Sequence, residues 1–177
     1  GRMFTFENFE VHPDMVVIGK GLGGGVLPMA AVIAREDLDV ASDRALGHYT
    51  HEKNPVLCAA ALATIGYIEQ HGLVDHARTL GRDTLARLKE MQTRHPLIGD
   101  VRGLGLFLGI ELVKDHGTRE RAVDEAEAVM YAALSRGLSF KTTMGNILTL
   151  TPPLTITAEE MDRALAILEE CIGEVER

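Results

Sequence analysis

Cysteine, positive charge and long apolar runs are scarce in this 177-residue sequence, and each scarcity argues against a class of protein. The two cysteines, Cys58 and Cys171, lie far apart and form neither a disulfide framework nor a paired metal motif. Lysine and arginine number 18 against 26 acidic residues, and no basic stripe with interleaved aromatic residues suggests a nucleic-acid surface. No apolar stretch is long enough to span a bilayer, and no signal-peptide pattern opens the printed sequence. We therefore predict a protein with no nucleic-acid and no membrane partner, in a reducing cytoplasm.

The remaining composition is that of a globular protein with a buried core. Hydrophobic residues make up 46% of the chain and charged residues 25%, which is typical of such proteins. The length allows one domain, or a small domain joined to part of another.

The most informative feature is a single lysine, Lys20, in a turn made almost entirely of glycine (19–25). Glycines let the backbone take positive φ angles and let a bulky ligand approach closely. A lysine partly withdrawn from water loses some of its preference for charge, which makes it a usable nucleophile or base. Such an amine can condense with an aldehyde, so the pattern favours a Schiff-base role.

Two other interpretations of this turn are open. The glycines could form a tight hairpin that carries a solvated lysine. A phosphate loop fits less well, because Gly21 follows Lys20 where G-x-x-x-x-G-K-[ST] needs a hydroxyl residue. The glycines also fail to match the G-x-G-x-x-G spacing of a dinucleotide loop.

Two short apolar runs, 15–18 and 29–34, predict a pair of strands around Lys20. The connection between them is too short and too rich in glycine for a crossover helix. The strands should therefore be antiparallel neighbours with Lys20 in or beside their turn. Continuous apolar runs are typical of strands that are covered on both faces, and we expect such burial for the first run.

Helix and strand patterns alternate along the rest of the chain. Asn54 and Pro55 predict the N-cap and first residue of a helix that ends at Gly72. A second amphipathic helix follows and ends before Pro96. The further predictions are strand structure over 99–113, a helix over 119–136, short strands at 138–141 and 147–150, and a last helix behind the capping box of Thr157 and Glu160. Together they predict a small α/β layer, in which the glycines of 99–113 mark close backbone packing.

Several motifs recur together, in this order and spacing, in one enzyme family. They are Pro13-Asp14, Gly19-Lys20-Gly21, Pro28, Tyr-Thr-His-Glu-Lys-Asn-Pro (49–55), Gly-Asp-Val-Arg-Gly-Leu-Gly-Leu (99–106) and Thr-Pro-Pro-Leu-Thr-Ile (151–156). The chain resembles the class III aminotransferases, which are pyridoxal-phosphate enzymes of fold type I, from residue 1 to about residue 175. The resemblance implies an α/β fold of the aspartate aminotransferase type. Residues 1–75 would form the end of the large cofactor-binding domain, and residues 76–177 the small C-terminal domain.

The resemblance also implies roles for two residues. Lys20 matches the lysine that holds pyridoxal 5'-phosphate as an internal aldimine and then moves the proton between substrate and cofactor carbons. Thr50 matches the phosphate-binding threonine, which in the family serves the active site of the neighbouring subunit. We therefore expect at least a homodimer with shared sites. Lys53 is a second amine nearby, and its polar loop favours a solvated or ion-paired side chain.

His48, His51 and Glu52 could suggest a metal site, but they lack the H-E-x-x-H spacing of the zinc proteases. We predict no metal here. Next to a cofactor phosphate, His51 fits a hydrogen-bond donor better.

The sequence departs from the resembled family at Thr149. Many members have an arginine there, which grips the substrate α-carboxylate as a bidentate fork. A hydroxyl cannot replace a guanidinium in that task. We therefore expect a substrate other than a standard α-amino acid, such as an ω-amine, an amino alcohol derivative or an amine with a phosphonate or phosphate group. Lys141, or a residue upstream of Gly1, would then hold its anionic group, while the sequence around Arg102 favours a structural role.

The predicted reaction is transfer of an amino group between a small-molecule amine and an oxo acid. The alternative within enzymes is a lyase that releases ammonia or phosphate from an amino-alkyl phosphonate or phosphate. The alternative outside enzymes is a binding or structural module. We expect this piece to be the C-terminal part of a longer polypeptide and inactive alone, because the family's aspartate, stacking aromatic residue and second phosphate loop would lie upstream of Gly1.

Overall fold

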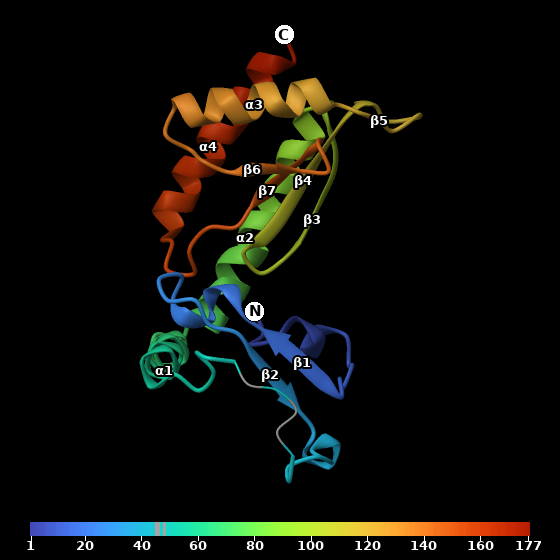
Figure 1. The fold of residues 1–177 in the computed structure, drawn as a ribbon. Coiled ribbons are helices and arrows are strands. Elements are labelled where there is room, and N and C mark those ends of the chain that lie inside the picture. The colour runs from blue at the N-terminus through green and yellow to red at the C-terminus, as the bar shows by residue number, and fades with distance from the viewer. Residues whose placement is uncertain (45–46, 48) are drawn as a thin grey trace. The chain divides into compact units, whose positions relative to one another are not determined.

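The computed structural model describes residues 1–44, 47 and 49–177. The chain divides into two compact units (Figure 1). The first unit is Arg2–Leu73, and the second is Val74–Arg177 together with Gly1. Within the described ranges no helix is long and apolar enough to cross a lipid bilayer.

A two-stranded antiparallel sheet and one long helix form most of the first unit. Strand β1 (Met15–Ile18) pairs with β2 (Ala31–Ala34), and Ile18 lies opposite Ala31. The remaining elements are the short 3-10 helices η1 (Thr5–Asn8), η2 (Lys20–Gly23) and η3 (Glu36–Leu38), and helix α1 (Pro55–Gln70). The antiparallel pairing expected from the short glycine-rich connection is confirmed.

The expected burial of the first strand is wrong for this chain. Val17 on β1 is 76% exposed, and Val32 opposite it on β2 is 63% exposed. Helix α1 is similar, since Ala61 is its one buried residue among those described and Leu62 is 71% exposed. The apolar pattern is present in the sequence, but the first unit has too few elements to cover both faces of its sheet.

The start of α1 follows the prediction. The Asn54 side-chain oxygen accepts a hydrogen bond from the Val56 N–H at 2.9 Å, and Pro55 occupies the first helical position. A proline is tolerated there because its missing N–H would have no partner within the helix. The chain leaves the helix through Gly72, whose φ of 60° suits glycine.

The second unit is built on a five-stranded antiparallel sheet and three helices. The main path runs β3 (Ile98–Leu104), β4 (Phe107–Asp115), β7 (Ile147–Leu150), β6 (Lys141–Thr143), with β5 (Glu120–Arg121) paired to β4. The helices are α2 (Leu73–Arg94), α3 (Val123–Ser135) and α4 (Ala158–Val175). Helix α4 begins with the expected capping box, in which the Thr157 hydroxyl accepts from the Glu160 N–H and Glu160 accepts from the Thr157 N–H.

Three boundaries differ from the sequence prediction. The stretch 99–113 is a hairpin rather than one strand, and it turns at Gly105, which has a φ of 56°. Helix α3 begins at Val123 instead of residue 119, because Glu120 and Arg121 pair with β4. The strand expected at 138–141 lies at Lys141–Thr143.

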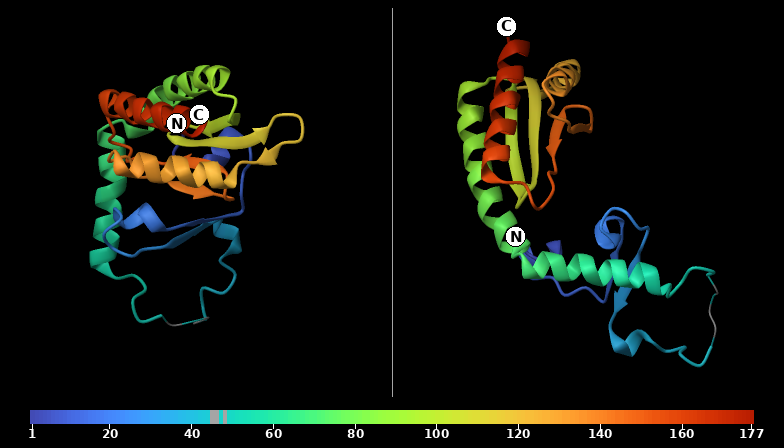
Figure 2. Two further views of the ribbon diagram at one scale, coloured as in Figure 1. Left: turned by 90° about the horizontal axis from the view of Figure 1, so that it is seen from above. Right: turned by 90° about the vertical axis from the view of Figure 1, so that its left-hand side faces the viewer.

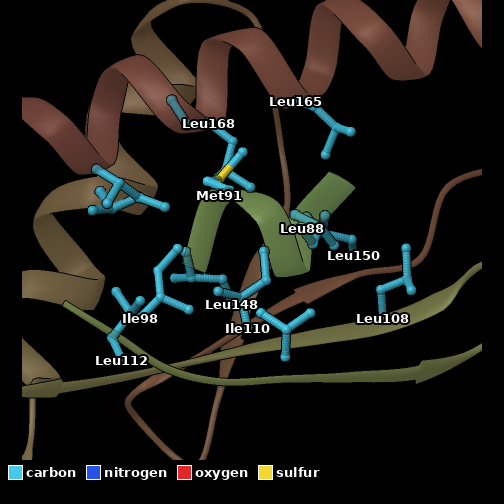
Figure 3. Close-up of a cluster of buried hydrophobic side chains, with 14 of the residues drawn as sticks. Leu88, Met91, Ile98, Leu108, Ile110, Leu112, Leu148, Leu150, Leu165 and Leu168 are labelled. Atoms are coloured by element: carbon cyan, nitrogen blue, oxygen red, sulfur yellow. The ribbon is translucent and has the colours of Figure 1, made fainter. Parts of the chain in front are cut away.

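The core of the second unit lies between the sheet and the helices, and α2 and α4 run alongside each other over it (Figures 2 and 3). Leu88 and Met91 on α2 and Leu165 and Leu168 on α4 face the strands. The strands contribute alternate residues, which are Leu108, Ile110, Leu112, Leu148 and Leu150. Full burial of one such side chain contributes about 1.5–3 kcal/mol, so this face of the sheet holds the unit together.

A buried asparagine connects the strands at one end of this sheet. Asn146, which is 1% exposed, follows Met144 and Gly145, both of which have positive φ. Its side-chain N–H donates to the Leu112 carbonyl at 2.9 Å, and its side-chain oxygen accepts from the Arg121 Nε at 3.0 Å. The Leu112 N–H also donates to the Asn146 carbonyl at 2.8 Å. Asn146, the residue just before β7, therefore connects β7 to β4 and β5.

Replacing Asn146 with alanine is expected to lower the free energy of unfolding by about 2–3 kcal/mol. The variant leaves the Arg121 Nε without this acceptor and removes one of the two donors to the Leu112 carbonyl in a buried place. Urea unfolding measures the loss. The matched control is Asn8→Ala, because Asn8 is exposed and its one hydrogen bond reaches only the Thr5 carbonyl. Equal stability of the two variants would contradict a bridging role for Asn146.

Candidate functional site

Lys20 lies where β1 ends and the chain turns back toward β2. It is the first residue of η2, directly after Gly19. A Cβ atom on Gly19 would lie 3.3 Å from the Ala30 Cβ, so the two ends of the loop approach closely at its base. The prediction that Lys20 lies in or beside the β1–β2 turn is confirmed.

The backbone of this loop takes positive φ at Lys20 (52°), Gly24 (73°) and Gly25 (75°). Glycine adopts these angles freely, whereas a residue with a side chain pays about 1–3 kcal/mol. Strained residues of this kind cluster at functional sites. The conformation of Lys20 therefore supports a functional role for the amine that it carries.

Helix α1 lies directly against the loop. A Cβ on Gly24 would come within 3.1 Å of the Thr64 Oγ1, which itself donates to the Ala60 carbonyl at 2.8 Å. Gly23 is buried in the same contact region. The loop can lie this close to the helix because glycine has no side chain at these positions.

The Lys20 side chain is exposed, so the described residues do not provide the partial withdrawal from water that is expected from the sequence. The loop is open at Gly21 and Gly25, where a Cβ would meet no described atom within 4 Å. An accessible primary amine on a glycine-rich loop fits a ligand that binds through an aldehyde carbon. The geometry therefore suits pyridoxal 5'-phosphate at this lysine.

Thr50 lies in the turn that leads into α1, and its side chain is exposed. At the start of this helix Pro55 has no N–H and the Val56 N–H donates to the Asn54 side chain, so an anion here would meet mainly the positive end of the helix dipole. Lys53, in the same turn, is also exposed and has a φ of 55°. No hydrogen bond joins Lys20 to Thr50 in the part of the chain that the structure describes, so the role of Thr50 stays a prediction.

The metal interpretation rested on His48, His51 and Glu52. His48 lies outside the described residues. Among the residues that are described, no group of three histidine, cysteine or acidic side chains is placed to hold a metal ion.

Thr149 lies on β7 in the second unit and is 8% exposed. Its hydroxyl is 2.7 Å from that of Thr143 on β6, and Lys141 lies directly opposite it in the register. The sequence analysis singled out Thr149 and Lys141 but missed Thr143. The pairing of β6 with β7 is what brings Thr143 next to Thr149. From the sequence alone, the spacing of two residues shows only that Thr143 and Lys141 share one face of a strand.

Arg102 has the structural role that its sequence context suggests. Its guanidinium donates to Asp100 on β3 at 2.6 Å and to Glu111 on β4 at 2.7 Å. These two carboxylates, Asp100 first, raise the pKa of Arg102. The arginine therefore ties the first two strands of the sheet together.

The sequence model of the family described as "Aminotransferase class-III" matches residues 1–172 of this chain. The chain is 47% identical over 175 residues to the (R)-1-hydroxy-2-aminoethylphosphonate ammonia-lyase of Vibrio splendidus, with 99% of this chain and 36% of that enzyme covered. It is 45% identical over 177 residues to the leucine/methionine racemase of Thermococcus litoralis, with 99% and 40% covered.

The fold of this chain also matches that of a solved structure. The amine transaminase from an uncultivated Pseudomonas species, in its PLP-bound internal aldimine form, matches with a TM-score of 0.89 and 28% identity. That match covers 98% of this chain and 41% of the transaminase. The chain thus spans about 36–41% of the length of these three proteins, and it has the fold of the corresponding part of the pyridoxal-phosphate-dependent transaminases. It belongs to the class III aminotransferase family, whose enzymes use pyridoxal 5'-phosphate.

Proposed function

We propose that this chain carries the catalytic lysine of an enzyme that removes or transfers the amino group of a small amine, with pyridoxal 5'-phosphate bound covalently to Lys20. The observation that carries the proposal is the accessible Lys20 amine, held at a positive φ on a glycine loop in a chain that the family matches over residues 1–172. When bound, the cofactor supplies a ring that withdraws electrons from the substrate carbon.

Lys20 has two tasks in this proposal. Its neutral amine is the nucleophile that binds the cofactor carbonyl. Once the substrate amine has displaced it, the same amine takes the proton from the substrate carbon that bears nitrogen and returns it to another atom. The β1–β2 pairing, which ends two residues before Lys20 at Ile18, anchors the start of the loop, while the four-carbon side chain of Lys20 is free to move between these positions.

Thr50 is the proposed phosphate ligand, and the positive end of the α1 dipole supports the bound anion. A hydroxyl and the positive end of a helix dipole both favour an anion. Following the family resemblance, we place Thr50 in the site of a second subunit, so that a homodimer is the active unit.

We also propose that residues 1–75 complete a large cofactor domain and that residues 76–177 form a small domain. The enzyme is further proposed to work in the cytoplasm.

For the reaction, we propose release of ammonia from an amino-alkyl phosphonate. Two observations support it. A relative with 47% identity is named as an ammonia-lyase for such a compound, and Thr149 cannot form the planar fork that an arginine offers to an α-carboxylate. For a 2-amino-1-hydroxyalkyl phosphonate, the proton on C2 is removed and the hydroxyl on C1 leaves as water. Hydrolysis of the resulting enamine then returns a water molecule, breaks the C2–N bond, and gives ammonia and the 2-oxoalkyl phosphonate. This balance needs no oxidant and no second substrate.

Amino transfer between an amine and an oxo acid is the second candidate. The family description and the amine transaminase structure favour it. The two candidates differ in one requirement, because transfer needs an oxo acid to accept the amino group and elimination does not. Ammonia release from an amino-alkyl phosphonate without any oxo acid would support the lyase. Turnover that stops when the oxo acid is left out would support the transferase instead.

The covalent step is tested by borohydride reduction with pyridoxal 5'-phosphate, followed by peptide mapping. The longest form of the protein is used, because the chain spans less than half of its relatives. A phosphopyridoxyl group on Lys20 is the expected result. If that form carries no such group, or carries it only on another lysine, the proposed function is wrong.

A further inference from the structure

A polar hollow of about 390 Å³ lies in the second unit, where β3 begins beside the later part of β4. Gly99 and Val113 form its apolar part, and a Cβ on Gly99 would come within 2.7 Å of both Val113 methyl groups. The remaining lining side chains are charged or polar, and they are Asp100, Arg102, Glu111, His116 and Arg119. The volume lies within the range of small-molecule sites, about 300–1,000 Å³.

Two of the lining residues, His116 and Arg119, belong to the connection between β4 and β5. The His116 Nε2 donates to the Pro96 carbonyl at 2.8 Å, because a carbonyl oxygen can only accept. The Asp115 carbonyl accepts from the Arg119 N–H at 2.9 Å, and the Asp115 side chain accepts from the Thr118 N–H at 2.7 Å. These bonds attach the connection to the segment before β3 and fix its backbone.

The Arg119 guanidinium lines the hollow without compensation of its charge. Within the described ranges no carboxylate lies at ion-pair distance from it, whereas Arg102 and Lys114 on the neighbouring strands are both paired. The φ of Arg119 is 58°. Such a conformation costs about 1–3 kcal/mol for a residue with a side chain, and it is found most often at functional sites. An anionic group in the hollow would find an unused cation here.

Arg102 uses only part of its guanidinium for the ion pairs that join β3 and β4. A single nitrogen, Nη1, donates to the Asp100 Oδ2 and to the Glu111 Oε2. The Arg102 Nε and Nη2 have no acceptor among the described residues, and two parallel N–H groups of this kind fit the two oxygens of a carboxylate. Each of the two acids also keeps one oxygen that can accept from a further donor.

The charges around the hollow favour a ligand that carries both signs. Two carboxylates, Asp100 and Glu111, stand against the two guanidiniums of Arg102 and Arg119. A ligand with a net charge would disturb this balance and leave one set of free groups without a partner. A zwitterion keeps the balance, since its anionic end can meet the guanidiniums and its cationic end the unused carboxylate oxygens.

We propose that this hollow binds a free α-amino acid. Arg119 and the unused edge of Arg102 hold its carboxylate, and the unused oxygens of Asp100 and Glu111 accept from its ammonium. An ammonium has three donors, so it can reach both acids at once. Every residue of this site lies within the second unit, and the proposal therefore does not depend on the proposed function of Lys20.

The test is a calorimetric titration of the longest form of the protein with glycine. The protein is first treated with pyridoxal 5'-phosphate and borohydride, so that no aldehyde remains to react with the amine. Glycine is expected to bind more tightly than acetate, which lacks the ammonium, and than methylamine, which lacks the carboxylate. Arg119→Gln should weaken glycine binding by about tenfold or more, since charge-assisted hydrogen bonds contribute on that scale.

The fold should tolerate Arg119→Gln, because the side chain is exposed. Arg82→Gln is the matched control, since it removes the same side chain from the exposed surface of α2, where Arg82 pairs with the adjacent Asp83. This control should bind glycine as the parent does. Glycine binding that is absent from the parent, unchanged in Arg119→Gln or equally weakened in both variants would overturn the proposal. Acetate or methylamine binding as tight as that of glycine would overturn the assignment to a zwitterion.

Discussion

Lys20→Ala is expected to abolish covalent incorporation of pyridoxal 5'-phosphate and to lower turnover by at least about 10²–10⁴-fold. The loss follows from removing the group that both binds the cofactor carbonyl and moves the substrate proton, and positioned acid–base groups alone contribute on this scale. Stability should change by less than about 0.5 kcal/mol, because the side chain is exposed. Absorbance of the bound cofactor and borohydride trapping measure incorporation, steady-state rates measure turnover, and urea unfolding measures stability.

Lys53→Ala is a closely matched control for this variant. Lys20 and Lys53 are both exposed lysines of the first unit with nearly the same backbone conformation, φ 52° and 55°. The two substitutions therefore remove the same charge and the same side chain from the same backbone geometry. If cofactor trapping and turnover survive in Lys20→Ala but fail in Lys53→Ala, the Schiff base forms on Lys53 and the proposed role of Lys20 is wrong.

Local patterns in the sequence were enough to predict where Lys20 lies. The apolar runs on either side of the glycine loop are short, and the loop is too short for a crossover, so antiparallel pairing was the one simple solution. The Asn54 cap and the capping box of Thr157 and Glu160 were predicted for the same reason. Each depends on residues within three or four positions of one another.

Features that depend on distant partners were not predictable in this way. The apolar run of β1 indicated burial on both faces, yet burial depends on what packs against the strand, and Val17 is exposed here. The start of α3 shifted because Glu120 and Arg121 pair with β4, which no local pattern indicates. The 2.7 Å contact between the Thr143 and Thr149 hydroxyls depends on the register of β6 against β7, which no local pattern indicates.

Gly81→Ala is expected to lower the free energy of unfolding by about 2 kcal/mol, although helix propensity alone predicts the opposite. Gly81 lies inside α2, where alanine is favoured over glycine by about 1 kcal/mol. A Cβ at Gly81, however, would overlap the carbonyl group of Gly105 and come within 2.6 Å of its Cα. Gly105 is at the β3–β4 turn with a φ of 56°, so its backbone cannot move without disturbing the hairpin. Overpacking of this kind costs about 1–3 kcal/mol or more.

Gly173→Ala separates the two effects within the same unit. Gly173 lies inside α4, and a Cβ there would meet only the His95 ring, at the ordinary contact distance of 3.6 Å. Propensity should therefore decide, and this variant should be more stable than the parent by up to about 1 kcal/mol. Urea unfolding of both variants under one condition measures the difference, which should reach about 3 kcal/mol. If Gly81→Ala were as stable as Gly173→Ala, the close approach of α2 to the β3–β4 turn would not be part of the folded structure.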